Sequence, residues 1–143
     1  MKRIFAGTII FLIFTSSIWA NTKYFQRVIR TAKNYRIETS QDDMKVIADA
    51  KGKQAFYITL KSNRNNFEMV MLVGFIAAGE AMKTGFEPDN VFVTIDVPLG
   101  EGLRMVTTAE KKDVKELLSG KINSAQFARI IWETEQSNIS SIR

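Results

Sequence analysis

The middle of the chain carries eleven uncharged residues in a row, Met69-Val70-Met71-Leu72-Val73-Gly74-Phe75-Ile76-Ala77-Ala78-Gly79. A helix needs about 20 apolar residues to cross a membrane, so this run is too short to do so. Asn65 and Glu68 have the three-residue spacing of a capping box, and Gly85 follows where a helix can end in left-handed geometry. We therefore predict a central helix that is buried on most of its circumference.

Small residues recur along this predicted helix at Gly74, Ala77, Ala78 and Ala81. Such a strip lets another backbone approach closely. The strip can pack the helix flat on a sheet, or it can form a helix-to-helix contact in a dimer. Because the second use remains open, Gly74, Ala78 and Ala81 are candidate interaction residues.

Segments that alternate apolar and polar residues lie on both sides of the central helix. Residues 91–97 alternate without a break, and residues 103–107 follow them after a loop that contains Pro98. Before the helix, residues 44–50 and 54–60 form a second hairpin pattern around Lys51-Gly52. In 54–60 both faces are at least partly apolar, which suits a sheet that is covered on one side and partly shielded on the other.

Helical patterns occupy the two ends of the domain. Residues 21–35 are amphipathic, with Phe25, Val28, Ile29, Ala32 and Tyr35 on one side. Near the C-terminus, Thr107 with Glu110 and Asn123 with Gln126 have capping-box spacing, and Gly120 lies between the two predicted helices. Residues 117–127, with their spacing of Leu, Gly, Ile and Phe, resemble the short C-terminal helical module called SHOCT. From that local resemblance we infer no function.

These patterns predict an α+β fold of two layers with the element order α-ββ-α-ββ-αα. Two hairpins joined through a helix give a four-stranded, mostly antiparallel sheet with packed helices. We expect one domain over residues 21–136 and a frayed polar tail over 137–143.

The first 20 residues have the order of a secretory signal: a basic start, an apolar stretch and small residues ending at Ala20. We therefore expect a cleaved signal peptide and a periplasmic or secreted domain. The alternative is a membrane anchor formed by residues 4–20. Five basic residues follow this segment with no acidic residue among them: Lys23, Arg27, Arg30, Lys33 and Arg36. This favours the anchor, because positive charge next to a membrane segment tends to stay on the cytoplasmic side.

The amino-acid composition excludes several kinds of chemistry but does not identify a particular reaction. The chain of 143 residues is 45% hydrophobic and 24% charged, which is typical of a globular protein. It contains no cysteine and no histidine, which excludes disulfides, thiolate metal sites, thiol nucleophiles and the commonest general base. The formal charge of +5 is weak evidence for nucleic acid. We predict no cofactor and no metal site.

Acidic residues offer the remaining route to catalysis. Glu80 interrupts the apolar helix and is expected to pair with Lys83 or to reach water. Asp96 and Glu101 lie on and beside the predicted hairpin of residues 91–107, and Asp89 precedes it, but their spacing is not that of a calcium loop. The loop at Gly100 and Gly102 lacks the spacing of a phosphate-binding loop. We predict no catalytic residue, and we read the lysine-rich terminal helices as solvated rather than as a DNA-binding unit.

The function that these observations favour is a non-catalytic exported module that binds another protein or forms a homodimer. A small-ligand or lipid-binding domain is the alternative, and a carboxylate-based enzyme is a weaker one. The basic side of the first helix allows contact with an anionic membrane surface. The candidate interaction residues are Lys23, Arg27, Arg30, Gly74, Ala78 and Ala81.

Overall fold

The computed structural model describes residues 21–98 and 102–141, with side chains described as far as residue 132. The predicted signal segment 1–20 and Glu101 therefore lie outside the described residues. A helix covers residues 21–34, and the other elements follow in the order η1 (Gln41–Asp43), β1 (Met44–Ala48), β2 (Gln54–Lys61), α2 (Phe67–Ala81), η2 (Met82–Thr84), β3 (Asn90–Val97), β4 (Leu103–Glu110), α3 (Lys111–Ser119) and α4 (Ser124–Ser141). The backbone is thus helical through part of the segment predicted as a frayed tail.

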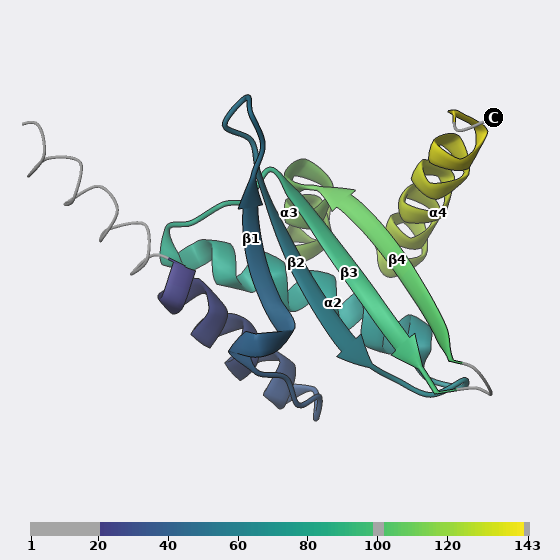
Figure 1. Cartoon of the computed structure of the whole chain (residues 1–143), viewed down its shortest axis with the longest axis horizontal. Helices are drawn as coiled ribbons and strands as arrows, with labels where there is room; N and C mark the ends of the chain where they lie inside the picture. The colour runs from purple at the N-terminus through teal and green to yellow at the C-terminus, as the bar shows by residue number, and fades with distance from the viewer. Residues whose placement is uncertain (1–20, 99–101, 142–143) are drawn as a thin grey trace, which may run out of the picture.

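The predicted element order α-ββ-α-ββ-αα is confirmed, but the sheet is mixed rather than mostly antiparallel. The strands lie in the order β1-β2-β3-β4, and the two hairpins β1–β2 and β3–β4 are antiparallel (Figure 1). The central pair β2–β3 is parallel, with Ile58 opposite Val93. The 15 residues of α2 span about 22 Å, close to the length of a neighbouring strand, so α2 returns the chain to the end where β2 began. The crossover therefore makes the central pair parallel.

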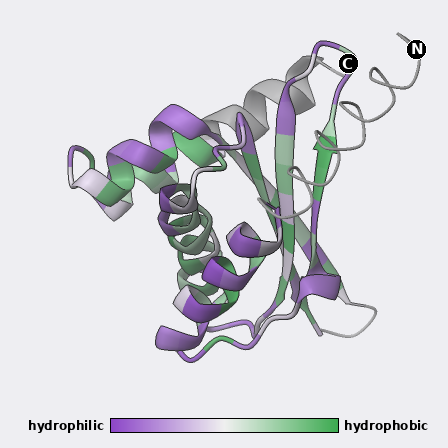
Figure 2. Ribbon diagram, turned by 90° about the vertical axis from the view of Figure 1, so that its left-hand side faces the viewer, coloured by the Kyte–Doolittle hydropathy of each residue, from purple (hydrophilic) through white to green (hydrophobic). Residues whose placement is uncertain are grey.

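The helices form a single layer on one face of the sheet (Figure 2). Along β3, partly buried and fully buried side chains alternate strictly. The buried side chains, which face the helices, are those of Val91, Val93, Ile95 and Val97. Along β2 the inward residues are Phe56, Ile58 and Leu60. In the described part of the chain no helix covers the opposite face.

The helix α2 lies close against the sheet at Gly74. A methyl group added at this glycine would lie 2.9 Å from Val93 Cγ1 and 3.2 Å from Leu60 Cδ1. At Gly74 the small-residue strip therefore packs against the sheet, which is one of its two predicted uses.

The N-terminal helix joins the core through Tyr24. Its ring makes edge-to-face contacts with Phe56 at 4.9 Å and with Phe86 at 5.2 Å. Its hydroxyl donates a hydrogen bond of 2.8 Å to the carbonyl of Ala78. The N–H of Met82 donates to Gly79 and Glu80 where α2 tightens into η2, and not to Ala78 as an α-helix would continue. Tyr24 thus supplies a donor at the end of the central helix.

Three predicted helix starts have different outcomes. The pair Asn123 and Gln126 forms the predicted capping box, with reciprocal bonds of 2.9 and 2.8 Å between side chain and backbone. The prediction at Thr107 is wrong, because β4 continues to Glu110 and the buried Thr107 hydroxyl donates to the carbonyl of Val93. The prediction at Asn65 is also wrong.

At the start of α2 the N-cap is Asn66, which makes no side-chain cap bond. Asn63 instead accepts the backbone N–H groups of Asn65 and Asn66 through its side-chain oxygen. Asn side chains often accept hydrogen bonds from backbone N–H groups two or three residues further along a turn. With several Asn residues close together, sequence spacing does not show which of them accepts these bonds.

Candidate functional site

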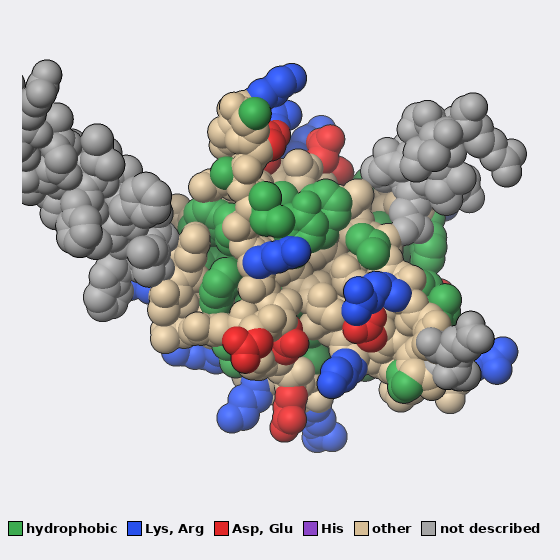
Figure 3. Space-filling view, in the orientation of Figure 1, with side chains coloured by type: hydrophobic (Ala, Val, Ile, Leu, Met, Phe, Trp, Pro, Cys, Tyr) green, Lys and Arg blue, Asp and Glu red, His purple; other side chains and the backbone are tan. Residues whose placement is uncertain are grey.

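Within the described residues, the helices cover one face of the sheet and leave the other uncovered (Figure 2). Strand register places its side chains in rows that run across the four strands. We call it the open face, and it comprises Lys45, Ile47, Ala55, Tyr57, Thr59, Lys61, Asn90, Phe92, Thr94, Asp96, Arg104, Val106, Thr108 and Glu110. Hydrophobic side chains gather over the middle of this face, with a basic side chain beside them (Figure 3).

An aromatic pair occupies the middle of the open face. Tyr57 and Phe92 are opposite each other on the parallel strands, and their rings stack with centroids 4.5 Å apart and planes 8° apart. Lys45, the partner of Tyr57 on β1, places its ammonium nitrogen 5.3 Å from the centroid of the Tyr57 ring. Both ring faces of Tyr57 are therefore occupied, one by Phe92 and the other by a cation.

Aliphatic residues and unpaired lysines surround this pair. Ile47 is 46% exposed and Val106 is 45% exposed, although both are large apolar residues. Lys45 and Lys61 form no ion pair with any side chain in the described residues. The open face thus combines apolar side chains with an excess of basic residues, since its acids are Asp96, which Arg104 binds, and Glu110.

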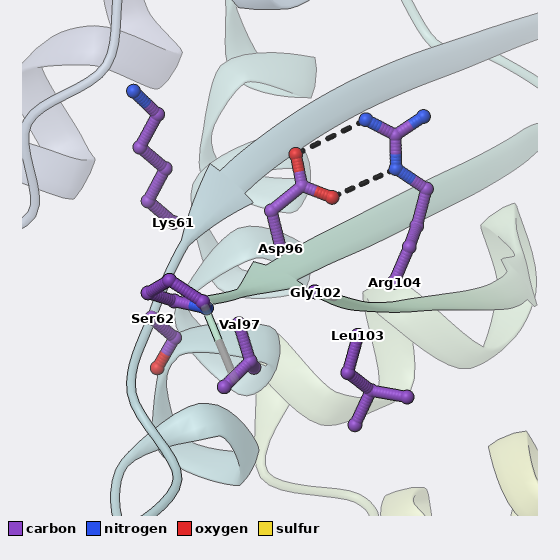
Figure 4. A pocket seen from close by; sticks show the side chains of 8 residues that line it. Lys61, Ser62, Asp96, Val97, Gly102, Leu103 and Arg104 are labelled. Carbon is purple, nitrogen blue, oxygen red and sulfur yellow. Dashed lines mark hydrogen bonds and ion pairs between the residues drawn. The ribbon is translucent and has the colours of Figure 1, made fainter. Parts of the chain in front are cut away.

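An ion pair between Asp96 and Arg104 lies at one end of the open face. Arg104 binds Asp96 through two hydrogen bonds, from Nε at 2.7 Å and from Nη2 at 3.1 Å. These bonds, together with the charges of Arg104 and Lys61, lower the pKa of the Asp96 carboxyl. Figure 4 shows Lys61, Asp96 and Arg104 projecting from one side of the sheet, and Val97 and Leu103 from the other. A hollow of about 530 Å³ lies beside this pair.

The other acidic residues singled out from the sequence serve as local partners. Glu80 accepts a hydrogen bond of 2.9 Å from Lys83, as predicted. Asp89 accepts the backbone N–H of Gln54 and lies 3.9 Å from Lys111 Nζ, so it ties β2 to the start of α3. Within residues 21–98 and 102–132, no three acidic side chains gather as metal ligands would. Sequence spacing did not anticipate the roles of Asp89 and Asp96, because their partners are distant in the chain.

The predicted interaction residues divide into two groups. Lys23 and Arg30 are exposed on the N-terminal helix, and Arg27 is partly exposed. Arg27 and Arg30 line a groove against α2 and α3. Gly74, Ala78 and Ala81 are instead buried between α2 and the rest of the domain, so a partner cannot reach them in this structure.

The open face itself was only partly visible in the sequence. Alternation over residues 54–60 indicated that the outer face of β2 is apolar at Tyr57. However, the pairing of Tyr57 with Phe92 depends on the parallel β2–β3 register, which an antiparallel arrangement does not predict. The sequence does contain one indication of this pair: β2 and β3 each carry one aromatic residue, Tyr57 and Phe92, among the positions that alternate with the buried ones.

In the part of the chain that the structure describes, no helix is long and apolar enough to cross a bilayer. Comparison of the chain with protein-family models, with curated proteins and with solved structures finds no match.

Proposed function

We propose that this domain is a non-catalytic module that binds another protein through the open face of its sheet. The observation that carries the proposal is the apolar surface of that face: the half-buried rings of Tyr57 and Phe92 stack at its centre with no helix of the described chain over them, and the exposed Ile47 and Val106 lie on the two outer strands. A surface that is both apolar and uncovered is costly in water, and burial against a partner recovers about 25 cal/mol for each Å² of apolar area.

The charges on the open face favour a heterologous partner over a second copy. Lys45 and Lys61 are unpaired among the described residues, whereas the carboxylate of Asp96 is already bound by Arg104. Two copies placed face to face would bring together two surfaces that each carry an excess of basic residues, because Lys45, Lys61 and Arg104 outnumber Asp96 and Glu110. A partner with apolar side chains flanked by Asp or Glu complements both the centre and the lysines.

The geometry of the aromatic pair favours protein over nucleic acid. Proteins that bind single strands offer free aromatic faces on which bases stack. Here the faces of Tyr57 are occupied by Phe92 and by the Lys45 ammonium group, which leaves ring edges for contact. Ring edges and aliphatic neighbours suit the side chains of a protein partner better than a row of bases.

We also propose that the domain is exported, on the basic, apolar and small-residue order of residues 1–20. The alternative is an anchor formed by residues 4–20. The intact mass of the protein from its own host separates the two: a chain that begins at Asn21 in the soluble envelope fraction supports export. A full-length chain in the membrane fraction supports the anchor.

Matched serine variants test the proposed surface. Ile47→Ser and Val106→Ser each remove an apolar side chain that is 46% or 45% exposed on the open face, and Met69→Ser removes one that is 53% exposed on α2. Because the exposures are similar, we expect similar small effects on stability. A partner that co-purifies with wild type and with Met69→Ser, but not with the open-face variants, supports the proposal. Equal loss in all three variants, or in none, contradicts it.

A homodimer is the competing outcome. Sedimentation of the purified protein over a wide concentration range reports it directly. A dimer that Val106→Ser dissociates would replace the heterologous partner with a second copy.

A further inference from the structure

The helical layer contains a groove of about 600 Å³ that the proposed function does not use. The N-terminal helix contributes Arg27 and Arg30 to it, α2 contributes Ile76 and Glu80, and α3 contributes Leu117 and Leu118. Its volume falls within the range of about 300–1,000 Å³ that is common for small-molecule sites. The groove shares no residue with the open face.

The groove holds more positive than negative charge. Glu80 is its acidic residue, and the closest cation to Glu80 is Lys83 at 2.9 Å rather than Arg27 at 3.8 Å. Arg30 forms no ion pair with any side chain of the described residues. Two guanidinium groups therefore face a carboxylate whose charge Lys83 already balances.

The uncharged lining combines polar residues, Thr31, Asn34 and Ser124, with the ring of Tyr35 and three aliphatic side chains. Ile76, Leu117 and Leu118 are half-buried, and each leaves part of its side chain accessible in the groove. Fully buried hydrophobic residues usually complete a core. These three are partly exposed and lie in the same groove as Arg30, which has no ion pair among the described residues, and Arg27, which is 3.8 Å from Glu80, so they offer a ligand apolar contacts beside the charged ones. An anionic group with an attached alkyl chain matches both halves of this lining.

We propose that this groove binds a single-chain anionic amphiphile. Arg27 and Arg30 would bind its carboxylate or phosphate, because guanidinium groups bind such groups through paired hydrogen bonds. Ile76, Leu117 and Leu118 would contact its alkyl chain. This ligand site stands independently of a partner on the open face.

Titration calorimetry of the full protein with dodecanoate, below its micelle concentration, tests the proposal. We expect Arg30→Gln to weaken binding by about tenfold, the loss typical of one charge-assisted contact. Lys33→Gln is the matched control, because Lys33 is exposed on the same helix but does not line the groove. The Lys33→Gln variant should bind dodecanoate with the affinity of the wild type. Circular dichroism verifies that each variant is folded.

Two further probes separate the parts of the ligand. Dodecanol lacks the anion and acetate lacks the chain, and both should bind at least tenfold more weakly than dodecanoate. Equal binding of dodecanol, equal weakening by Lys33→Gln and Arg30→Gln, or no binding of dodecanoate would each overturn the proposal.

Vesicles that contain phosphatidylglycerol distinguish a free ligand from a membrane headgroup. Vesicle binding that Arg30→Gln reduces and Lys33→Gln does not would place a lipid headgroup in the same groove. Equal reduction by both variants would instead show that diffuse charge on the helix attracts the membrane, and the groove would lose its assigned role for lipid.

Discussion

The phenyl ring of Phe92 stacks on the phenol ring of Tyr57 across two parallel strands, with 4.5 Å between the centroids and 8° between the planes. The two residues are direct partners in the β2–β3 register, so the stack depends on that register. It lies where the crossover through α2 brings the two hairpins together. The same contact therefore joins the two halves of the sheet and forms the centre of the proposed docking surface.

A double-mutant cycle measures this stack. Tyr57→Ala and Phe92→Ala should each cost modest stability, since both side chains are only partly buried. The double variant should lose less than the sum of the two, by about 0.5–1.5 kcal/mol, the coupling typical of aromatic pairs. Urea unfolding of the four proteins gives the coupling. A strictly additive result would mean that the rings do not interact.

The hydroxyl of Tyr24 gives a second prediction. Tyr24→Phe removes the hydrogen bond to Ala78 and leaves that carbonyl without this donor at a site that is fully buried. We expect a loss of about 1–3 kcal/mol in the free energy of unfolding. Tyr57→Phe removes a hydroxyl from the open face and serves as the control. If both variants lose the same stability, the Tyr24 bond contributes nothing specific.

The close approach at Gly74 gives a third prediction. Alanine favours a helix interior over glycine by about 1 kcal/mol. Gly74→Ala should nevertheless destabilise the protein by about 1–3 kcal/mol, because the added methyl group meets Val93 on the sheet. The double variant Gly74→Ala with Val93→Ala removes the obstructing methyl groups, so it should be less destabilised than the two single losses predict. A stabilised Gly74→Ala variant would contradict the packing of α2 on β3.

The pair Asp96 and Arg104 predicts a pH dependence. Hydrogen bonds from Arg104 lower the pKa of Asp96 in the folded state below its ordinary value of about 3.9. The unfolded chain therefore takes up this proton first as the pH falls. The contribution of the pair is fully present above the ordinary pKa, and it disappears as the pH falls through the lower folded value.

Melting temperatures measured from pH 2 to pH 7 test this behaviour in wild type and in Asp96→Asn. The variant should lose less stability on acidification than wild type does, since it no longer has this carboxylate to protonate. Glu87, whose pKa is lowered by its hydrogen bond from Lys115, remains in both proteins and gives a shared background. Parallel curves would show that the Asp96 pair does not contribute.

Local patterns were sufficient to predict the elements of this fold. Alternation in β3, the uncharged run in α2 and the pair Asn123 and Gln126 depend on neighbours within a few residues. The direction of β3 against β2 was not predictable from the same patterns, because it depends on where α2 returns the chain. The strand that continues through Thr107 was missed because its hydroxyl is satisfied by Val93, which is 14 residues away.

The candidate site was less predictable than the fold for the same reason. The basic residues Arg27 and Arg30 were found from helical spacing, and they do line a groove. Two of the three aliphatic residues in that groove, Leu117 and Leu118, come from α3, whose position no local pattern determines. Likewise, the alternation of β2 exposes Tyr57, but only the sheet register places Phe92 on its ring.

Site-specific photo-cross-linking in the native host tests the proposed docking surface most directly. A photoreactive residue replaces Thr94, at the centre of the open face, or Lys112, which is exposed on α3. We predict a discrete cross-linked protein from position 94 and none from position 112. Its yield should fall when Lys45 and Lys61 are both changed to Glu, and should not fall when Lys33 is. No product from position 94, or the same product from both positions, would contradict binding at the open face.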